Sequence, residues 1–180
     1  ARKEDLPRQQ DLFQRAMAAR PDPAAEAAAH YQLGRAQAQH RRFVAGDRAA
    51  VERLTEQAEA CFKRSHAIAC DNGAADSDLA GLSACEIAHL SFSLQNYEKA
   101  CEWFDKGFDA LSDDSQLMRA AFAACYGYAL FAQRRYDEAE RLFDRYLAEV
   151  QSVLPDRVIC AALVAAGVTA ALHGDVAHGS

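Results

Sequence analysis

Apolar residues recur at intervals of three and four along almost the whole chain, and short polar, glycine- or proline-containing stretches interrupt them. This periodicity is typical of amphipathic helices that bury one face, and nothing in the pattern indicates a strand. The connections are short, so neighbouring helices should pack as antiparallel pairs. The sequence therefore predicts about eight helices, at roughly 5–19, 24–44, 48–70, 78–94, 97–111, 116–133, 136–151 and 156–173.

One segment of the chain nearly repeats itself after 39 residues. The letters YEKA at 97–100, followed by FDK at 104–106, return as YDEA at 136–139, followed by FDR at 143–145. Self-similarity at a fixed period of this size is typical of helical repeat arrays, in which each unit buries its apolar face against the next. Such arrays commonly bind other proteins.

The repeated positions resemble the tetratricopeptide repeat, a helix–turn–helix unit. Its first helix carries a small residue, its second helix carries Ala-x-x-x-Phe, and small residues let the helices approach while Phe fills the space beside them. The first-helix position is filled by Leu33-Gly34, Ile87-Ala88, Tyr126-Gly127 and Ala166-Gly167, and the second-helix pairs are Ala58 with Phe62, Ala100 with Phe104, and Ala139 with Phe143.

The resemblance implies an all-α fold, a right-handed superhelical solenoid of antiparallel helix pairs. It covers residues 1–180 as a single domain, with half units at 1–22 and 155–180 and full units at about 23–72, 76–112 and 115–153. The spacings from Phe62 to Phe104 to Phe143 are 42 and 39 residues, longer than the common 34-residue unit. In this respect the chain is similar to the elongated repeats of kinesin light chains and of bacterial regulators. The proline that usually closes a unit is missing after Leu111.

The resemblance also implies that the first helices line a concave groove. Groove residues would lie next to the small position or about one turn away from it. Some of them could instead pack against an adjacent helix, Phe92 and Phe131 in particular. The mixed aromatic and weakly polar composition is that of a groove for a peptide or a helix. Chaperone-binding members of the family hold a terminal carboxylate with Lys, Asn and Arg on successive first helices, and here only Arg35 stands near such a position. The resemblance therefore implies a protein or peptide partner that presents apolar side chains rather than an acidic tail. The predicted groove residues are Tyr31, Arg35, Gln39, Cys85, His89, Phe92, Ser93, Ala124, Tyr128 and Phe131.

Charge and hydropathy narrow the range of partners. The 180 residues carry a net charge of -6, and Lys and Arg are scattered, so the chain offers no basic surface for nucleic acid. The longest apolar run, Val158 to Leu172, has about 15 residues, fewer than the roughly 20 that cross a bilayer. We therefore expect neither nucleic-acid binding nor membrane insertion.

The cysteines indicate a compartment. Six of them are dispersed singly through predicted helices where alanine would also fit, which favours small buried side chains over a disulfide framework. A reducing, cytoplasmic setting follows as an expectation. The six are Cys61, Cys70, Cys85, Cys101, Cys125 and Cys160.

Two Cys–His pairs are candidate chemical sites. His66 with Cys70 and Cys85 with His89 are each four residues apart, so each pair shares a helix face and could offer two ligands to zinc. They lie at unequal distances from the connecting turn and lack the tight spacing of zinc modules. Cys85 and His89 also lack a third orienting group for nucleophilic catalysis. We therefore predict no metal, no cofactor and no enzyme.

The leading hypothesis is a non-catalytic scaffold that binds a peptide or helical segment in its groove. A second hypothesis is a sensor domain that binds a small molecule or signalling peptide and controls an attached effector domain, and a third is a secretion-type chaperone. The chain begins at Ala1 and ends at Ser180, where another second helix would be expected to start, which favours a piece of a longer protein. An uncovered terminal helix could also mediate homo-oligomer formation.

Overall fold

The computed structural model describes residues 5–73 and 77–153, and all regular structure in these two stretches is helical. The all-α prediction is confirmed for this part of the chain. The elements are α1 (Asp5–Ala18), α2 (Pro23–His40), the 3-10 turn η1 (Arg41–Phe43), α3 (Arg48–Asp71), α4 (Ser77–Ser93), α5 (Tyr97–Ala110), α6 (Gln116–Ala132) and α7 (Tyr136–Val153).

Seven of the predicted helices correspond to these elements, and most of their ends agree within two residues. The exception is the segment predicted to be helical from 24 to 44, where α2 ends at His40 and the chain tightens into η1 before α3. Aspartate side chains cap the starts of α2 and α3, because Asp22 accepts a hydrogen bond from Ala25 N at 2.7 Å and Asp47 accepts one from Ala50 N at 3.0 Å. The eighth predicted helix lies outside the described residues.

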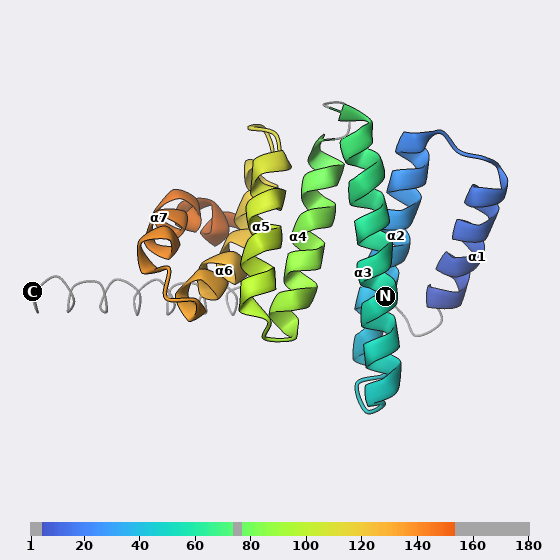
Figure 1. The fold of residues 1–180 in the computed structure, drawn as a ribbon, viewed down its shortest axis with the longest axis horizontal. Coiled ribbons are helices and arrows are strands. Elements are labelled where there is room, and N and C mark those ends of the chain that lie inside the picture. The colour runs from blue at the N-terminus through green and yellow to red at the C-terminus, as the bar shows by residue number, and fades with distance from the viewer. Residues whose placement is uncertain (1–4, 74–76, 154–180) are drawn as a thin grey trace, which may run out of the picture.

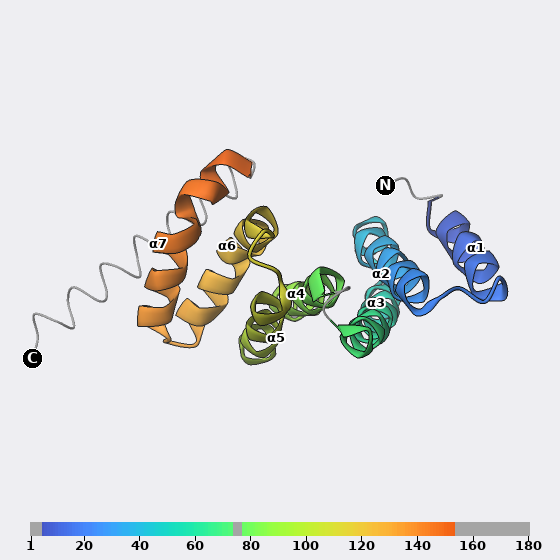
Figure 2. The same cartoon turned by 90° about the horizontal axis from the view of Figure 1, so that it is seen from above.

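The helices are arranged as packed consecutive pairs. The most extensive contacts join α2 with α3, α4 with α5, and α6 with α7, and α3 also packs on α4. Figure 1 shows these pairs side by side in a row, with α1 at one end against α2. In addition, α2 touches α4 and α4 touches α6. Seen from above, these three helices lie along one side of the row, whereas α3 and α5 lie along the other (Figure 2). We call the side formed by α2, α4 and α6 the first-helix face.

Small residues let the paired helices approach closely. A Cβ added to Gly34 on α2 would lie 2.9 Å from the ring of Phe62 on α3, and one added to Gly127 on α6 would overlap the ring of Phe143 on α7. Ala88 and Phe104, at the matching positions of α4 and α5, belong to one buried cluster. The predicted packing of Phe against a small residue is therefore confirmed in all three pairs. We call these three interfaces the pair seams.

The α4–α5 seam contains a second close approach that the sequence pattern did not indicate. A Cβ on Gly81 would lie 2.9 Å from the backbone oxygen of Gly107, and a Cβ on Gly107 would lie 2.5 Å from the Sγ atom of Cys85. Cys85 is consequently buried in this seam with no exposed surface.

The turns after α4 and α6 are copies of each other. Gln95 and Arg134, 39 residues apart, both adopt a left-handed backbone, with φ of 60° and 59°. Asn96 N donates to Ser91 O at 3.0 Å, and Arg135 N donates to Leu130 O at 2.9 Å. This is the six-residue hydrogen bond that closes a helix through a left-handed residue, although glycine is the usual occupant. The repeat in sequence is thus also a repeat in backbone geometry.

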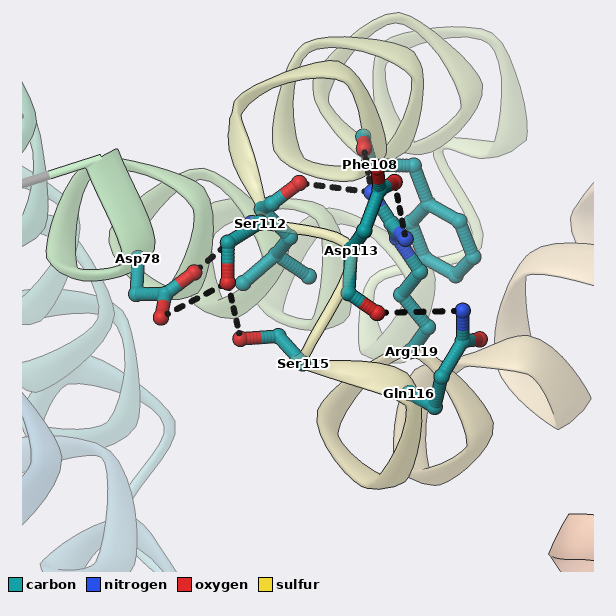
Figure 3. Close-up of polar contacts among 8 residues, drawn as sticks. Asp78, Phe108, Ser112, Asp113, Ser115, Gln116 and Arg119 are labelled. Atoms are coloured by element: carbon teal, nitrogen blue, oxygen red, sulfur yellow. Dashed lines mark hydrogen bonds and ion pairs between the residues drawn. The ribbon is translucent and has the colours of Figure 1, made fainter. Parts of the chain in front are cut away.

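A polar network holds the connection between α5 and α6, where the closing proline is missing. Asp78 at the start of α4 accepts hydrogen bonds from Ser112 N at 2.8 Å and from Ser112 Oγ at 3.1 Å. Arg119 of α6 reaches back and donates to the carbonyl oxygens of Leu111, at 2.6 Å, and Phe108, at 3.1 Å (Figure 3). These bonds satisfy carbonyl groups at the end of α5 and fix the position of α6 relative to α4.

Candidate binding surface

Side chains of α2, η1 and α4 enclose a hollow of about 250 Å³ on the first-helix face. It brings together four of the predicted groove residues: Arg35, Gln39, His89 and Ser93. We call it the α2–α4 hollow. Its complete lining is Arg35, Ala38, Gln39, Arg41, Glu86, His89, Leu90 and Ser93.

Glu86 and Arg35 form an ion pair at one side of the hollow. Arg35 Nε lies 3.7 Å from Glu86 Oε1, and the Arg35 guanidinium also lies 5.8 Å from the centre of the Tyr31 ring. Burial raises the pKa of Glu86, and Arg35 and the Tyr31 hydroxyl partly oppose this rise. Burial, together with Glu86, raises the pKa of Tyr31 to about 12, so its hydroxyl stays protonated near neutral pH. Charge on this side of the hollow is therefore internally balanced.

Arg41 lies on the other side of the hollow and lacks such a partner. Its two terminal nitrogens each lie 3.3 Å from Ser93 Oγ, a hydroxyl that already donates to Leu90 O at 2.7 Å. The Nε atom is buried and has no hydrogen-bond partner. Within the described residues no carboxylate forms an ion pair with Arg41. Partial burial lowers the pKa of Arg41.

His89 lies at the mouth of the hollow, where solvent reaches the ring. The surrounding helices nevertheless displace much of the nearby water, and this desolvation, followed by the charge of Arg41, lowers the pKa of His89. The imidazole is thus mainly neutral at pH 7 and can accept or donate a hydrogen bond.

Five aromatic rings from α4 to α7 form a connected row beside the hollow. Tyr128, which is 43% exposed, lies 5.7 Å from Phe92 and 6.3 Å from Phe131, measured between ring centres. Tyr97 packs 5.9 Å from Tyr128, and Tyr136 packs 5.6 Å from Phe131. Phe92 and Phe131 are half-buried, so both pack against neighbouring helices and keep part of the ring at the surface. We call these five residues the aromatic row. Because Phe92 lies three residues after His89 on α4, the two side chains share one face of that helix, and the row lies beside the hollow.

Three predicted groove residues do not reach the surface of this face. Tyr31, Cys85 and Ala124 are all buried. Each lies three residues before the small position of its helix, and one helical turn therefore places it on the seam side with the small residue. The residues one, four or five positions after the small residue, such as Arg35, Phe92 and Gln39, project elsewhere and line the open face.

Four residues of the hollow were not among the predicted groove residues, and two of them, Glu86 and Arg41, are charged. Glu86 lies two positions before Ala88, and Arg41 lies in η1, past the end of α2. The helical periodicity of the sequence does not reveal the change to a 3-10 turn that precedes the α2–α3 connection. The only sequence signal for Arg41 is a cationic residue near the end of the segment predicted to be helical from 24 to 44.

The two Cys–His pairs do not come together. The Sγ atom of Cys70 lies 3.7 Å from Nε2 of His66, whose Nδ1 is 2.9 Å from the backbone oxygen of Ala80, while Cys85 is buried in the α4–α5 seam. Across residues 5–73 and 77–153, no cluster of three or more metal-binding side chains occurs. The five cysteines in these stretches are free thiols.

A larger hollow of about 500 Å³ lies between α5, α6 and α7. One of its charged groups is Glu138, which accepts hydrogen bonds from Arg135 at 2.7 and 2.8 Å. This carboxylate already has its counter-ion, in contrast to Arg41.

No protein-family model matches the chain, and no curated protein or solved structure matches it either. None of the helices in the described stretches combines the length and the apolar character that crossing a membrane requires.

Proposed function

We propose that this chain is a non-catalytic scaffold that binds a peptide or a helical segment of another protein on its first-helix face. The proposal includes the finer architecture expected from the repeat, a right-handed superhelix of tetratricopeptide-like units, and a cytoplasmic setting. The observation that carries it is that the α2–α4 hollow and the aromatic row meet on one face of α4, where His89 and Phe92 are three residues apart. Together they combine exposed aromatic surface with a few directed polar groups, as peptide-binding grooves do.

The size of the hollow favours a peptide over a small molecule. Sites that enclose a drug-sized ligand have volumes of about 300–1,000 Å³, and the α2–α4 hollow has about 250 Å³. This is room for one or two side chains of an extended partner, whose other contacts would lie on the aromatic row. A small molecule is therefore the second choice at this hollow, and a sensor would more readily use the hollow of about 500 Å³ between α5, α6 and α7.

Selection of binders from a random peptide library tests the proposal. Binding of the selected peptides would be measured by fluorescence polarisation for the wild-type chain and for a His89→Ala/Tyr128→Ser double variant. We expect the double variant to lose about tenfold or more in affinity, because exposed aromatic anchors carry much of the energy of such interfaces. Glu102→Gln on α5, an exposed position off the first-helix face, is the matched control and should bind normally.

The failure of any peptide to bind, or equal binding by the double variant, would contradict the scaffold function. A metabolite library that raises the melting temperature while no peptide binds would favour the sensor instead.

A further inference from the structure

The α2–α4 hollow contains a guanidinium with a single acceptor among the described residues. Arg41 has five N–H donors, but its only acceptor among the described residues is the Ser93 hydroxyl, at 3.3 Å from each terminal nitrogen. Its Nε–H is buried and unpaired. The Nε–H is closed off from solvent, but the guanidinium as a whole is only partly buried and lines the hollow. A partly desolvated cation is stabilised by an anion, so the terminal nitrogens leave a place for one from outside the chain.

The charges around Arg41 specify what kind of anion fits. Arg35 and Glu86 form an ion pair and cancel each other, while His89 is mainly neutral at pH 7. The hollow therefore has a net charge of about one positive unit, located on Arg41. A monoanion balances this charge. A phosphate dianion would overcompensate it and would be repelled by the Glu86 carboxylate.

Resting on the proposed function, we infer that the α2–α4 hollow receives a single carboxylate of the bound peptide. The guanidinium of Arg41 would hold it through paired N–H donors, the geometry that planar carboxylates match best, with Ser93 and His89 as additional hydrogen-bonding groups. The neighbouring aromatic row would contact apolar side chains of the same peptide. The sequence predicted an apolar partner, and the unpaired Arg41 adds an acidic group to it.

Acetate is the simplest probe of this carboxylate site. A single carboxylate–guanidinium contact binds in roughly the 10–100 mM range, so about 100 mM acetate at constant ionic strength should populate it. We expect acetate to shift the NMR signals of the Arg41 Nε–H and the His89 ring, whereas acetamide should not. Inorganic phosphate at the same concentration should give smaller shifts than acetate.

Neighbouring arginines supply the matched controls. Arg41→Gln should abolish the response of His89 to acetate, while Arg42→Gln should retain it, because Arg42 is exposed and lies over the Phe43 ring at 5.1 Å. Arg41→Lys, which keeps the charge and loses the paired donors, should give an intermediate response. An unresponsive wild-type chain, or an unchanged response in Arg41→Gln, would overturn the inference.

Selected peptides distinguish the source of the carboxylate. An Asp→Asn or Glu→Gln change in the peptide should weaken binding about tenfold if a side chain supplies it, and C-terminal amidation should do so if the terminus does. The loss should disappear in the Arg41→Gln chain. If peptides bind but neither change matters, the carboxylate site is wrong while the scaffold stands. If acetate binds at Arg41 and no peptide binds, the scaffold is wrong while the anion site stands.

Discussion

The pair seams and the first-helix face are built from the same helices, yet they differ in how completely their side chains are buried and their polar groups paired. In the seams, rings such as Phe62 and Phe104 are fully buried, and glycine or alanine removes every atom that would obstruct them. On the first-helix face, Arg41 keeps an unpaired buried donor and Tyr128 keeps nearly half of its surface in water. The seams thus hold the buried core of the fold, whereas the first-helix face keeps aromatic and polar surface outside that core.

The strongest test of this division compares Phe104→Ala with Tyr128→Ala. Phe104 is fully buried in the α4–α5 seam, and its truncation should lower the free energy of unfolding by about 3–5 kcal/mol. Tyr128→Ala removes a ring that is 43% exposed and should lower it by about 1 kcal/mol. Urea unfolding followed by circular dichroism measures both. Equal losses would mean that the face is as much a part of the core as the seams are.

A smaller effect should separate two glycines. Gly127→Ala places a methyl group against the edge of the Phe143 ring, closer than van der Waals contact allows, and the required shift should destabilise the fold by about 1–3 kcal/mol, although alanine is the better helix former. Gly46→Ala is the control, because a Cβ there meets nothing within 4 Å. It should be close to neutral in the same thermal unfolding experiment. A neutral Gly127→Ala would show that the α6–α7 seam can open without loss.

The smallest effect should depend on pH, at the polar network between α4 and α6. Hydrogen bonds, first of all from the Ser112 backbone N–H, lower the pKa of Asp78 below its ordinary value of about 3.9. The native state then binds fewer protons than the unfolded state, so this stabilisation is complete above about pH 5 and is lost as the pH falls through the folded pKa. Asp78→Asn should cost about 1 kcal/mol at pH 7.

The difference between wild type and Asp78→Asn should therefore shrink between pH 5 and pH 2, measured by urea unfolding at each pH. Asp109→Asn on the exposed side of α5 is the control and should show little effect at any pH. A gap that stays constant with pH would mean that the ionised carboxylate of Asp78 does not stabilise the α5–α6 connection.

The features that local spacing dictates were the ones the sequence could predict. Apolar periodicity located seven helices, and the recurrence of a small residue with a Phe about one helix later identified all three pair seams. It was harder to predict which side of its helix each residue faces. Tyr31 and Cys85 lie one turn before a small residue and are buried with it in the seam, whereas Arg35 directly follows a small residue and reaches the surface.

Contacts between distant segments escaped prediction. Asp78 meets Ser112 across 34 residues, and Arg41 meets Ser93 across 52 residues. No periodic pattern encodes such pairs, since each depends on where two helices end after the seams have formed. The same reason explains why the unpaired guanidinium of the α2–α4 hollow became visible only in three dimensions.

The matching turns at Gln95 and Arg134 bear on how such a chain can change its length over generations. The helices that follow the two turns, α5 and α7, both begin after a left-handed residue and the same closing hydrogen bond. A duplicated or deleted 39-residue stretch would therefore join its neighbours through a connection that already exists, and gene copying alone could lengthen or shorten the array.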